Sequence, residues 1–303
     1  MSADPPRFLS PRVLIPFIAV TLIWGSTWIV IKDQISVVPP SWSVAYRFLL
    51  GAAVMFIIAA VTRTPLKIGR EGQVFAALFG LAQFALNFNF VYRSELYVTS
   101  GLVAAVFALL FLPNALLAWL FLGHRVTRRF VAGSVISVVG IALLFVNEAR
   151  GDEAARDATL TGIGFTVVAV LSASTANIMQ ATERARNLSM TAMLAWGMLW
   201  GGLADAALAW VTAGPPVFET RPGYWLGTAY LGIVASALAF SLYFKNIRDI
   251  GPARAAYSGV LIPVLAMGWS TLLEDYRWTG LAVAGSVVAL VGMVVALSAR
   301  RVD

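Results

Sequence analysis

The sequence contains no cysteine and a single histidine, and only 12% of its 303 residues are charged. The lack of cysteine excludes disulfides, thiolate nucleophiles and thiolate metal sites, and His124 alone cannot build a histidine metal site. Soluble domains carry about 25% charged residues, so we expect no soluble enzyme. We also expect no cofactor. The chain is instead apolar, with 59% hydrophobic residues and a mean hydropathy of +0.81.

Ten hydrophobic runs dominate the sequence. A helix of about 20 apolar residues crosses a bilayer, and the runs lie at 13–31, 42–62, 73–92, 98–120, 130–147, 161–181, 190–212, 223–243, 254–273 and 279–298. They leave too few residues for a domain outside the membrane. The pattern therefore predicts an all-α polytopic membrane protein of ten transmembrane helices that carries out its function within the bilayer.

The positive charges are divided unequally between the two ends of these runs. Of the 22 Lys and Arg residues, fifteen lie in the two tails and the even-numbered loops, Arg47 lies inside a run, and six lie in the odd-numbered loops: Lys32, Arg93, Arg150, Arg156, Arg221 and Arg277. Cytoplasmic loops are enriched in Lys and Arg, so we expect both termini in the cytoplasm. The net charge of +7 indicates orientation in a lipid membrane rather than a nucleic-acid partner.

An internal repeat relates two halves of the chain, 1–150 and 151–303. A shift of about 150 residues aligns Gly101 with Gly251, Pro113 with Pro263, Trp119 with Trp269, and Gly133-Ser134-Val135 with Gly285-Ser286-Val287. Each half holds five runs, an odd number, so the second half must be inverted relative to the first. Inverted repeats place a binding site near the midplane and suit alternating access, which predicts a secondary transporter.

Short motifs along the chain resemble a known family. Trp24-Gly25-Ser26-Thr27, Arg47-Phe48, Pro113, Leu122-Gly123, Pro263 and Glu274 are similar to the drug/metabolite transporter superfamily, EamA type. Within it, the chain looks most like the aromatic-amino-acid exporters of bacterial inner membranes (the YddG type). His124 stands where such families commonly carry Glu, so no role is transferred to that position.

The third run carries the richest group of polar side chains. Gln83 and Asn87 lie four residues apart and so share a helix face, with Phe88 beside them. Uncharged amides can donate to a carboxylate and accept from an ammonium without the cost of a buried ion, which favours a zwitterionic substrate. The alternative is that they only form hydrogen bonds between helices.

Further candidates for a substrate site lie in other runs. Trp24 and Trp28 could form the wall of an aromatic pocket or simply pack in the core. Pro113 and Pro263 should interrupt the fourth and ninth runs. Phe107, Phe111 and Tyr257 lie near these breaks. Asn177 is a polar candidate in the sixth run, and Phe240 could add to the wall from the eighth.

Two charges lie within the runs, Arg47 and Asp205. Charges at membrane depth are costly and are functional candidates by default. Arg47 lies near the outer end of its run and could extend toward the interface. We expect the two to form a structural ion pair, with proton binding by Asp205 as the alternative.

These observations favour export of aromatic and other apolar amino acids across the inner membrane. The alternative is efflux of amphipathic drugs or toxic metabolites with broad specificity. An intramembrane enzyme would need carboxylate clusters or a histidine acid–base pair, which the runs lack. We expect a monomer, and the sequence leaves a homodimer open.

Overall fold

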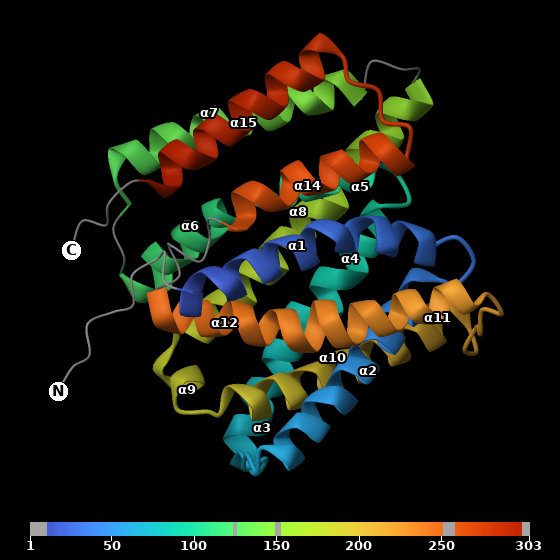
Figure 1. The fold of residues 1–303 in the computed structure, drawn as a ribbon, viewed down its shortest axis with the longest axis vertical. Helices are drawn as coiled ribbons and strands as arrows, with labels where there is room; N and C mark the ends of the chain where they lie inside the picture. The colour runs from blue at the N-terminus through green and yellow to red at the C-terminus, as the bar shows by residue number, and fades with distance from the viewer. Residues whose placement is uncertain (1–10, 124–125, 149–152, 251–257, 299–303) are drawn as a thin grey trace. The chain divides into compact units, whose positions relative to one another are not determined.

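The computed structural model describes residues 11–123, 126–148, 153–250 and 258–298, and their regular elements are all helices (Figure 1). Eight segments are long and apolar enough to cross a membrane: Val13–Gln34, Pro40–Val61, Gly69–Ser94, Ser100–Leu122, Arg128–Val146, Arg156–Ala181, Met190–Ala213 and Pro222–Asn246. Two shorter apolar helices, Ser258–Leu273 and Gly280–Ala296, coincide with the last two runs. Since helices satisfy their own backbone groups in lipid, the predicted all-helical membrane fold is confirmed.

The helical elements follow one another closely along the chain. They are α1 (Pro11–Gln34), α2 (Pro40–Val61), α3 (Gly69–Gly80), η1 (Leu81–Leu86), α4 (Asn87–Ser94), α5 (Ser100–Phe107), η2 (Ala108–Leu110), α6 (Phe111–Leu122), α7 (Arg128–Glu148), α8 (Glu153–Ala181), α9 (Glu183–Arg186), α10 (Met190–Ala213), α11 (Pro222–Ala229), η3 (Tyr230–Leu238), α12 (Ala239–Ile250), α14 (Ser258–Leu273) and α15 (Gly280–Leu297).

The two prolines expected to break helices behave differently. Pro113 lies in the first turn of α6, directly after the short 3₁₀ helix η2, so the fourth membrane segment is interrupted there. Pro263 lies inside α14, which continues through it. The proline removes one backbone donor, and the helix continues on both sides of it, so the ninth run is not divided into two helices at Pro263.

Two π-helical segments, η1 and η3, interrupt the membrane segments that contain them. The shift of 150 residues places 81–86 onto 231–236, which lies within η3. A π-helix widens the turn and appears frequently at functional sites. The same local distortion thus occurs at equivalent positions of the two halves.

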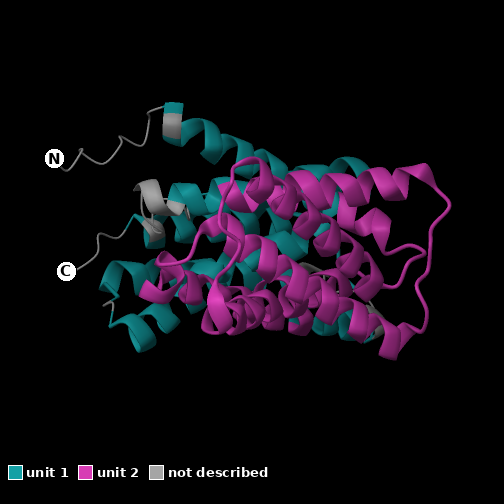
Figure 2. Cartoon of the chain, turned by 90° about the horizontal axis from the view of Figure 1, so that it is seen from below, with its two compact units in different colours: residues 1–29, 97–163, 242–303 teal, residues 30–96, 164–241 magenta. Residues whose placement is uncertain are grey.

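The chain forms two compact units, and each draws on both halves of the sequence. Unit 1 contains residues 1–29, 97–163 and 242–303, and unit 2 contains residues 30–96 and 164–241 (Figure 2). Three of the four boundaries between the units fall inside α1, α8 and α12, and the fourth, at 96/97, lies between α4 and α5.

In unit 1, α7 and α15 lie side by side and are packed through glycines (Figure 1). A Cβ atom at Gly133 would lie 2.7 Å from the carbonyl oxygen of Gly292, and one at Gly292 would lie 2.7 Å from that of Gly133. Gly140 and Gly285 are reciprocal in the same way. Because Gly133 and Gly140 align with Gly285 and Gly292 in the repeat, equivalent residues pack symmetrically across this antiparallel pair.

A second contact in unit 1 joins α5 to the end of α14. Glu274 accepts hydrogen bonds from the backbone N–H of Ser100, at 3.2 Å to Oε2, and from the side chains of Ser100 and Ser270. Ser270 also accepts from the backbone N–H of Gly101 at 2.8 Å. The first N–H groups of a helix lack partners within it, so the Glu274 carboxylate caps α5 from a neighbouring helix.

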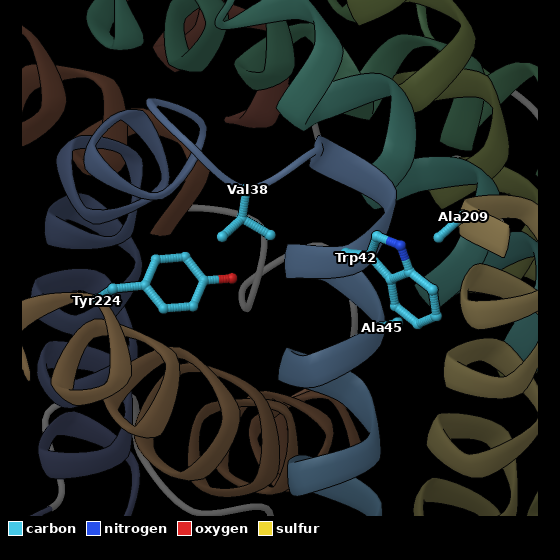
Figure 3. Packing of buried hydrophobic residues seen from close by; sticks show 5 residues of the cluster. All are labelled: Val38, Trp42, Ala45, Ala209 and Tyr224. Carbon is cyan, nitrogen blue, oxygen red and sulfur yellow. The ribbon is translucent and has the colours of Figure 1, made fainter. Parts of the chain in front are cut away.

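Unit 2 is built around α2 and α10. A buried cluster near the start of α2 joins them to α11, as Figure 3 shows: Val38, Trp42, Ala45, Ala209 and Tyr224. Deeper in the unit, a Cβ at Gly80 would lie only 2.2 Å from the carbonyl oxygen of Gly197, so α3 and α10 meet with their backbones in contact. Small residues permit this approach in membrane proteins.

Candidate functional site

The residues predicted for a substrate site are divided between the two units. Gln83, Asn87, Phe88, Asn177 and Phe240 belong to unit 2, whereas Trp24, Trp28, Phe107 and Phe111 belong to unit 1. Tyr257 and His124 lie outside the described residues. Each group is therefore considered within its own unit.

The two predicted amides lie on the π-distorted part of their membrane segment. Gln83 is in η1 and Asn87 is the first residue of α4, and both are buried. The side-chain Nδ2 of Asn87 donates to the carbonyl oxygen of Gln83 at 3.2 Å. The other amide atom, Oδ1 of Asn87, is buried and has no hydrogen-bond partner among the described residues.

Arg47 is enclosed by aromatic rings and a serine. It is 1% exposed, and its Nε donates to Oγ of Ser236, on η3, at 3.0 Å. The guanidinium carbon lies 4.3 Å from the ring centroid of Phe88 and 5.1 Å from that of Phe48, which are cation–π distances. Its Nη1 atom is buried without a hydrogen-bond partner in the described part of the chain.

The expectation that Arg47 extends toward the interface is wrong. The helix α2 begins at Pro40, so Arg47 lies seven residues, or about 10 Å of helical rise, inside the segment. Phe48 and Phe88 lie against its guanidinium, and the side chain is 1% exposed, so it remains buried within the helices.

Asp205 has a different set of partners. It is fully buried on α10, and its Oδ1 accepts a hydrogen bond from Nδ2 of Asn89. Oδ1 of Asn89 accepts from Oγ of Ser41 at 2.6 Å, and that Oγ accepts from Nη2 of Arg93 at 3.2 Å. The chain of bonds connects α10, α4 and α2 within unit 2.

The predicted ion pair between Arg47 and Asp205 is therefore wrong. Among the described residues no ion pair joins them: Arg47 bonds to Ser236 and Asp205 to Asn89. The carboxylate of Asp205 and the guanidinium of Arg47 lie at similar depths along their own helices, but they face different neighbours. Depth can be read from a sequence, whereas the direction of a side chain around the helix depends on packing.

A third buried polar group in unit 2 was not anticipated. The hydroxyl of Tyr92 donates to Oε1 of Gln34 at 3.0 Å, and Nε2 of Gln34 donates to Oγ1 of Thr228 at 2.7 Å. Gln34 ends α1 and Thr228 lies in α11. An amide in the last turn of a helix is common at a membrane interface, so its spacing alone gave no signal.

The remaining unit 2 candidates are less closely tied to these polar atoms. Phe240 packs edge-on against Phe84, with ring centroids 5.5 Å apart. The ring centroid of Phe84 lies 4.9 Å from that of Phe48, which is next to Arg47. Phe240 is thus connected to the Arg47 environment through one aromatic ring. Asn177 is half-buried on α8.

The unit 1 candidates form aromatic pairs rather than one cluster. The ring centroids of Trp28 and Phe107 lie 5.7 Å apart, and those of Trp24 and Tyr243 lie 5.0 Å apart. Phe111 belongs to a buried cluster on α6, α14 and α15 and packs against Phe130 at 5.8 Å. The rings of Trp28 and Phe107 are tilted by 60° to each other, an ordinary aromatic packing geometry.

Membrane-length helices in two repeats, with charged and amide side chains buried in them, define a polytopic membrane transporter and not an enzyme. The chain belongs to the EamA-like transporter family, which matches it twice, over residues 12–146 and 160–298. The two matches confirm that the sequence repeats a single unit.

Bacterial relatives extend over almost the whole chain. Protein PagO of Salmonella typhimurium is 24% identical over 285 residues, which cover 94% of this chain and 91% of PagO. A Salmonella typhimurium protein named "Probable amino-acid metabolite efflux pump" is 25% identical over 291 residues, covering 93% of this chain and 94% of that protein. A solved crystal structure, 21% identical, superimposes with a TM-score of 0.67 over 93% of this chain and 95% of its own, which shows a common fold.

Proposed function

We propose that this protein exports aromatic and other apolar amino acids across the bacterial inner membrane by alternating access. The observation that carries the proposal is the pair of buried amides, Gln83 and Asn87, on a distorted membrane segment next to Phe88. Amides can bind both ends of a zwitterion without a net charge of their own. The relative named as an amino-acid metabolite efflux pump supports the same substrate class.

The mechanism follows from the repeat. Two similar halves can exchange conformations, so that inward-open and outward-open states have comparable energies. We propose ten membrane crossings, the eight long segments and the shorter α14 and α15, with both termini in the cytoplasm. Reporter fusions at the two termini test the orientation, since opposite locations would require an odd number of crossings.

The transport experiment uses the purified full chain in proteoliposomes. Uptake of labelled tryptophan, phenylalanine and threonine is measured with and without a pH gradient, and counterflow is measured with unlabelled substrate inside. A carrier gives trans-stimulation and a channel does not. Lack of transport for all three amino acids, together with transport of amphipathic cations, would favour broad drug efflux instead.

Asn87→Ala tests the amide directly. Hydrogen bonds to charged groups contribute about 1.5–3 kcal/mol, so the variant should transport tryptophan about tenfold more slowly or worse. The matched control is Leu78→Ala on the same membrane segment, because Leu78 is 55% exposed in the structure. Equal rates in the two variants would contradict a role for Asn87 in substrate binding.

A further inference from the structure

Two buried polar atoms in unit 2 lack partners, and they have opposite hydrogen-bonding character. Nη1 of Arg47 can only donate, and Oδ1 of Asn87 can only accept; neither has a partner among the described residues. Both side chains are 1% exposed. Buried polar groups are nearly always hydrogen-bonded, so two complementary exceptions in one unit call for an explanation.

In the described part of unit 2 the guanidinium of Arg47 forms no direct ion pair, although the buried carboxylate of Glu95 interacts with it electrostatically. Its closer contacts are the hydroxyls of Ser236 and Tyr92 and the rings of Phe48 and Phe88. A buried charge without a direct ion pair is costly, and the cost is greater at membrane depth. A guanidinium has five N–H donors in a planar fork that matches a carboxylate, and the donor to Ser236 uses only one of them.

Phe88 brings the donor and the acceptor into one neighbourhood. It directly follows Asn87 in the chain, and its ring lies 4.3 Å from the guanidinium carbon of Arg47. The carboxylate and ammonium of an α-amino acid are carried by the same carbon atom. A receptor for both therefore needs a donor and an acceptor in one region, and the contact of Phe88 with Arg47 brings the helix segment that carries Asn87 close to the guanidinium.

Asp205 does not suit the ammonium of the same molecule. Its carboxylate is bonded to Asn89, which bonds Ser41 on α2. Ser41 and Arg47 are six residues apart on that helix, which corresponds to about 9 Å of rise. One α-amino acid head group cannot span both places.

The two π-helical segments flank the same place. Asn87 directly follows η1, and Ser236 lies within η3. These segments occupy equivalent positions in the two repeats, and such distortions frequently mark functional sites.

Building on the proposed function, we propose that Arg47 binds the carboxylate of the substrate and Oδ1 of Asn87 binds its ammonium. Recognition is then of the α-amino-acid head group, with the side chain left to the neighbouring aromatic rings. Amines without a carboxylate, and acids without an ammonium, are poorer ligands of this site.

Three probes that share an indole ring separate the two contacts. Binding of L-tryptophan, tryptamine and indolepropionate to the purified full chain is measured by titration calorimetry. The wild-type protein should bind tryptophan about tenfold or more tightly than either analogue. Arg47→Gln should weaken the binding of tryptophan and of indolepropionate by about tenfold or more, and it should leave the binding of tryptamine nearly unchanged.

Asn87→Ala should show the opposite pattern: it should weaken the binding of tryptophan and of tryptamine but not the binding of indolepropionate. Arg47→Lys keeps the charge without the planar fork and should recover part of the carboxylate affinity. Ser236→Ala removes the bond to Nε but keeps the cation, so it should weaken tryptophan less than Arg47→Gln does. Thermal unfolding of each variant is measured alongside.

A purely structural role for Arg47 predicts a different result. If Arg47→Gln weakened tryptophan and tryptamine by the same factor, or if Ser236→Ala matched it, the inference would be overturned while amino-acid export remained. If Arg47→Gln did not fold, wild-type discrimination against tryptamine and the Asn87→Ala pattern would decide: equal affinity for all three probes refutes the inference. Absence of binding for tryptophan, phenylalanine and threonine in the wild type would overturn the proposed function and this inference with it.

Discussion

The α7–α15 pair of unit 1 and the α2–α10 pair of unit 2 both pack through glycines, but they differ in the polar side chains that they bury. A Cβ at Gly202 of α10 would lie 3.0 Å from the backbone nitrogen of Leu49 on α2. Gly133 and Gly140 of α7 meet the backbone of α15 directly, and no charged side chain takes part in these contacts. On α2 and α10, buried side chains such as Arg47, Ser41 and Asp205 form hydrogen bonds to neighbouring helices. Both contacts lie in segments apolar enough for a membrane.

The difference separates scaffold from site. Lipid gives helices little hydrophobic reason to associate, so close packing of small residues is the economical way to hold two of them together. Buried ionisable groups are expensive in a membrane and mark functional positions. Unit 2 buries such groups at Arg47 and Asp205, whereas the α7–α15 pair of unit 1 packs through glycines.

The largest effect is expected from a single methyl group in the unit 1 pair. A Cβ at Gly292 would lie 2.3 Å from the backbone nitrogen of Ser137, which cannot move without displacing α7. Gly292→Ala should therefore lower the free energy of unfolding by about 3 kcal/mol, the upper end for overpacking. The thermal midpoint of the purified protein measures this loss.

Gly280 of the same helix provides the matched control, because a Cβ there would meet nothing within 4 Å. Gly280→Ala should leave the thermal midpoint unchanged or raise it slightly, since alanine favours helix. Similar midpoints for the two variants would mean that the glycines do not hold this pair together.

An intermediate effect is expected at Asp205 in unit 2. Asp205→Ala removes one of the two acceptors of Nδ2 of Asn89 and leaves only the carbonyl oxygen of Ala85, so one buried N–H loses its partner, which should cost about 1–3 kcal/mol of unfolding free energy. Asp205→Asn keeps an acceptor oxygen and should cost less. If Asp205→Asn kept its midpoint but lost pH-dependent transport, the carboxylate would be a proton-binding group and not only a hydrogen-bond acceptor.

The smallest effect is expected outside the membrane segments, between α10 and α11. The backbone N–H of Arg221 donates to Glu219 and, with the Arg221 side chain, holds the pKa of this carboxyl below its ordinary value of 4.5. A lowered folded-state pKa stabilises the protein at pH values above 4.5, and the contribution is lost as the pH falls through the folded-state pKa. The thermal midpoint should fall slightly more below pH 4.5 in wild type than in Glu219→Gln; identical pH profiles would contradict it.

The sequence carried much of the fold because membrane helices must be long and apolar, and because the repeat is visible in its glycines. Gly133 and Gly285 were aligned by sequence alone, and they pack against repeat-related residues in the structure. The site was harder to predict. Arg47 and Asp205 are the charges that lie well inside the predicted runs, and their similar depth suggested a pair that packing does not form.

Two physical causes limited the site prediction. The π-helical turn at η1 changes the phase of the helix after residue 81, so a regular period does not give the direction of Asn89 toward Asp205. The capping of α5 by Glu274 joins residues 174 positions apart, and no local spacing reveals such a contact. Glu274 was noticeable only as part of a family motif.

The reciprocal glycines of α7 and α15 have a consequence for how the two halves can diverge. Gly133 faces the backbone of Gly292 and Gly140 faces that of Gly285, so each half provides the space that the other occupies. A larger residue accepted in one half removes room from the other half at the same moment. At these positions the duplicated halves must change together or remain small, whereas the buried polar residues of unit 2 are free to differ between the halves and so to specialise.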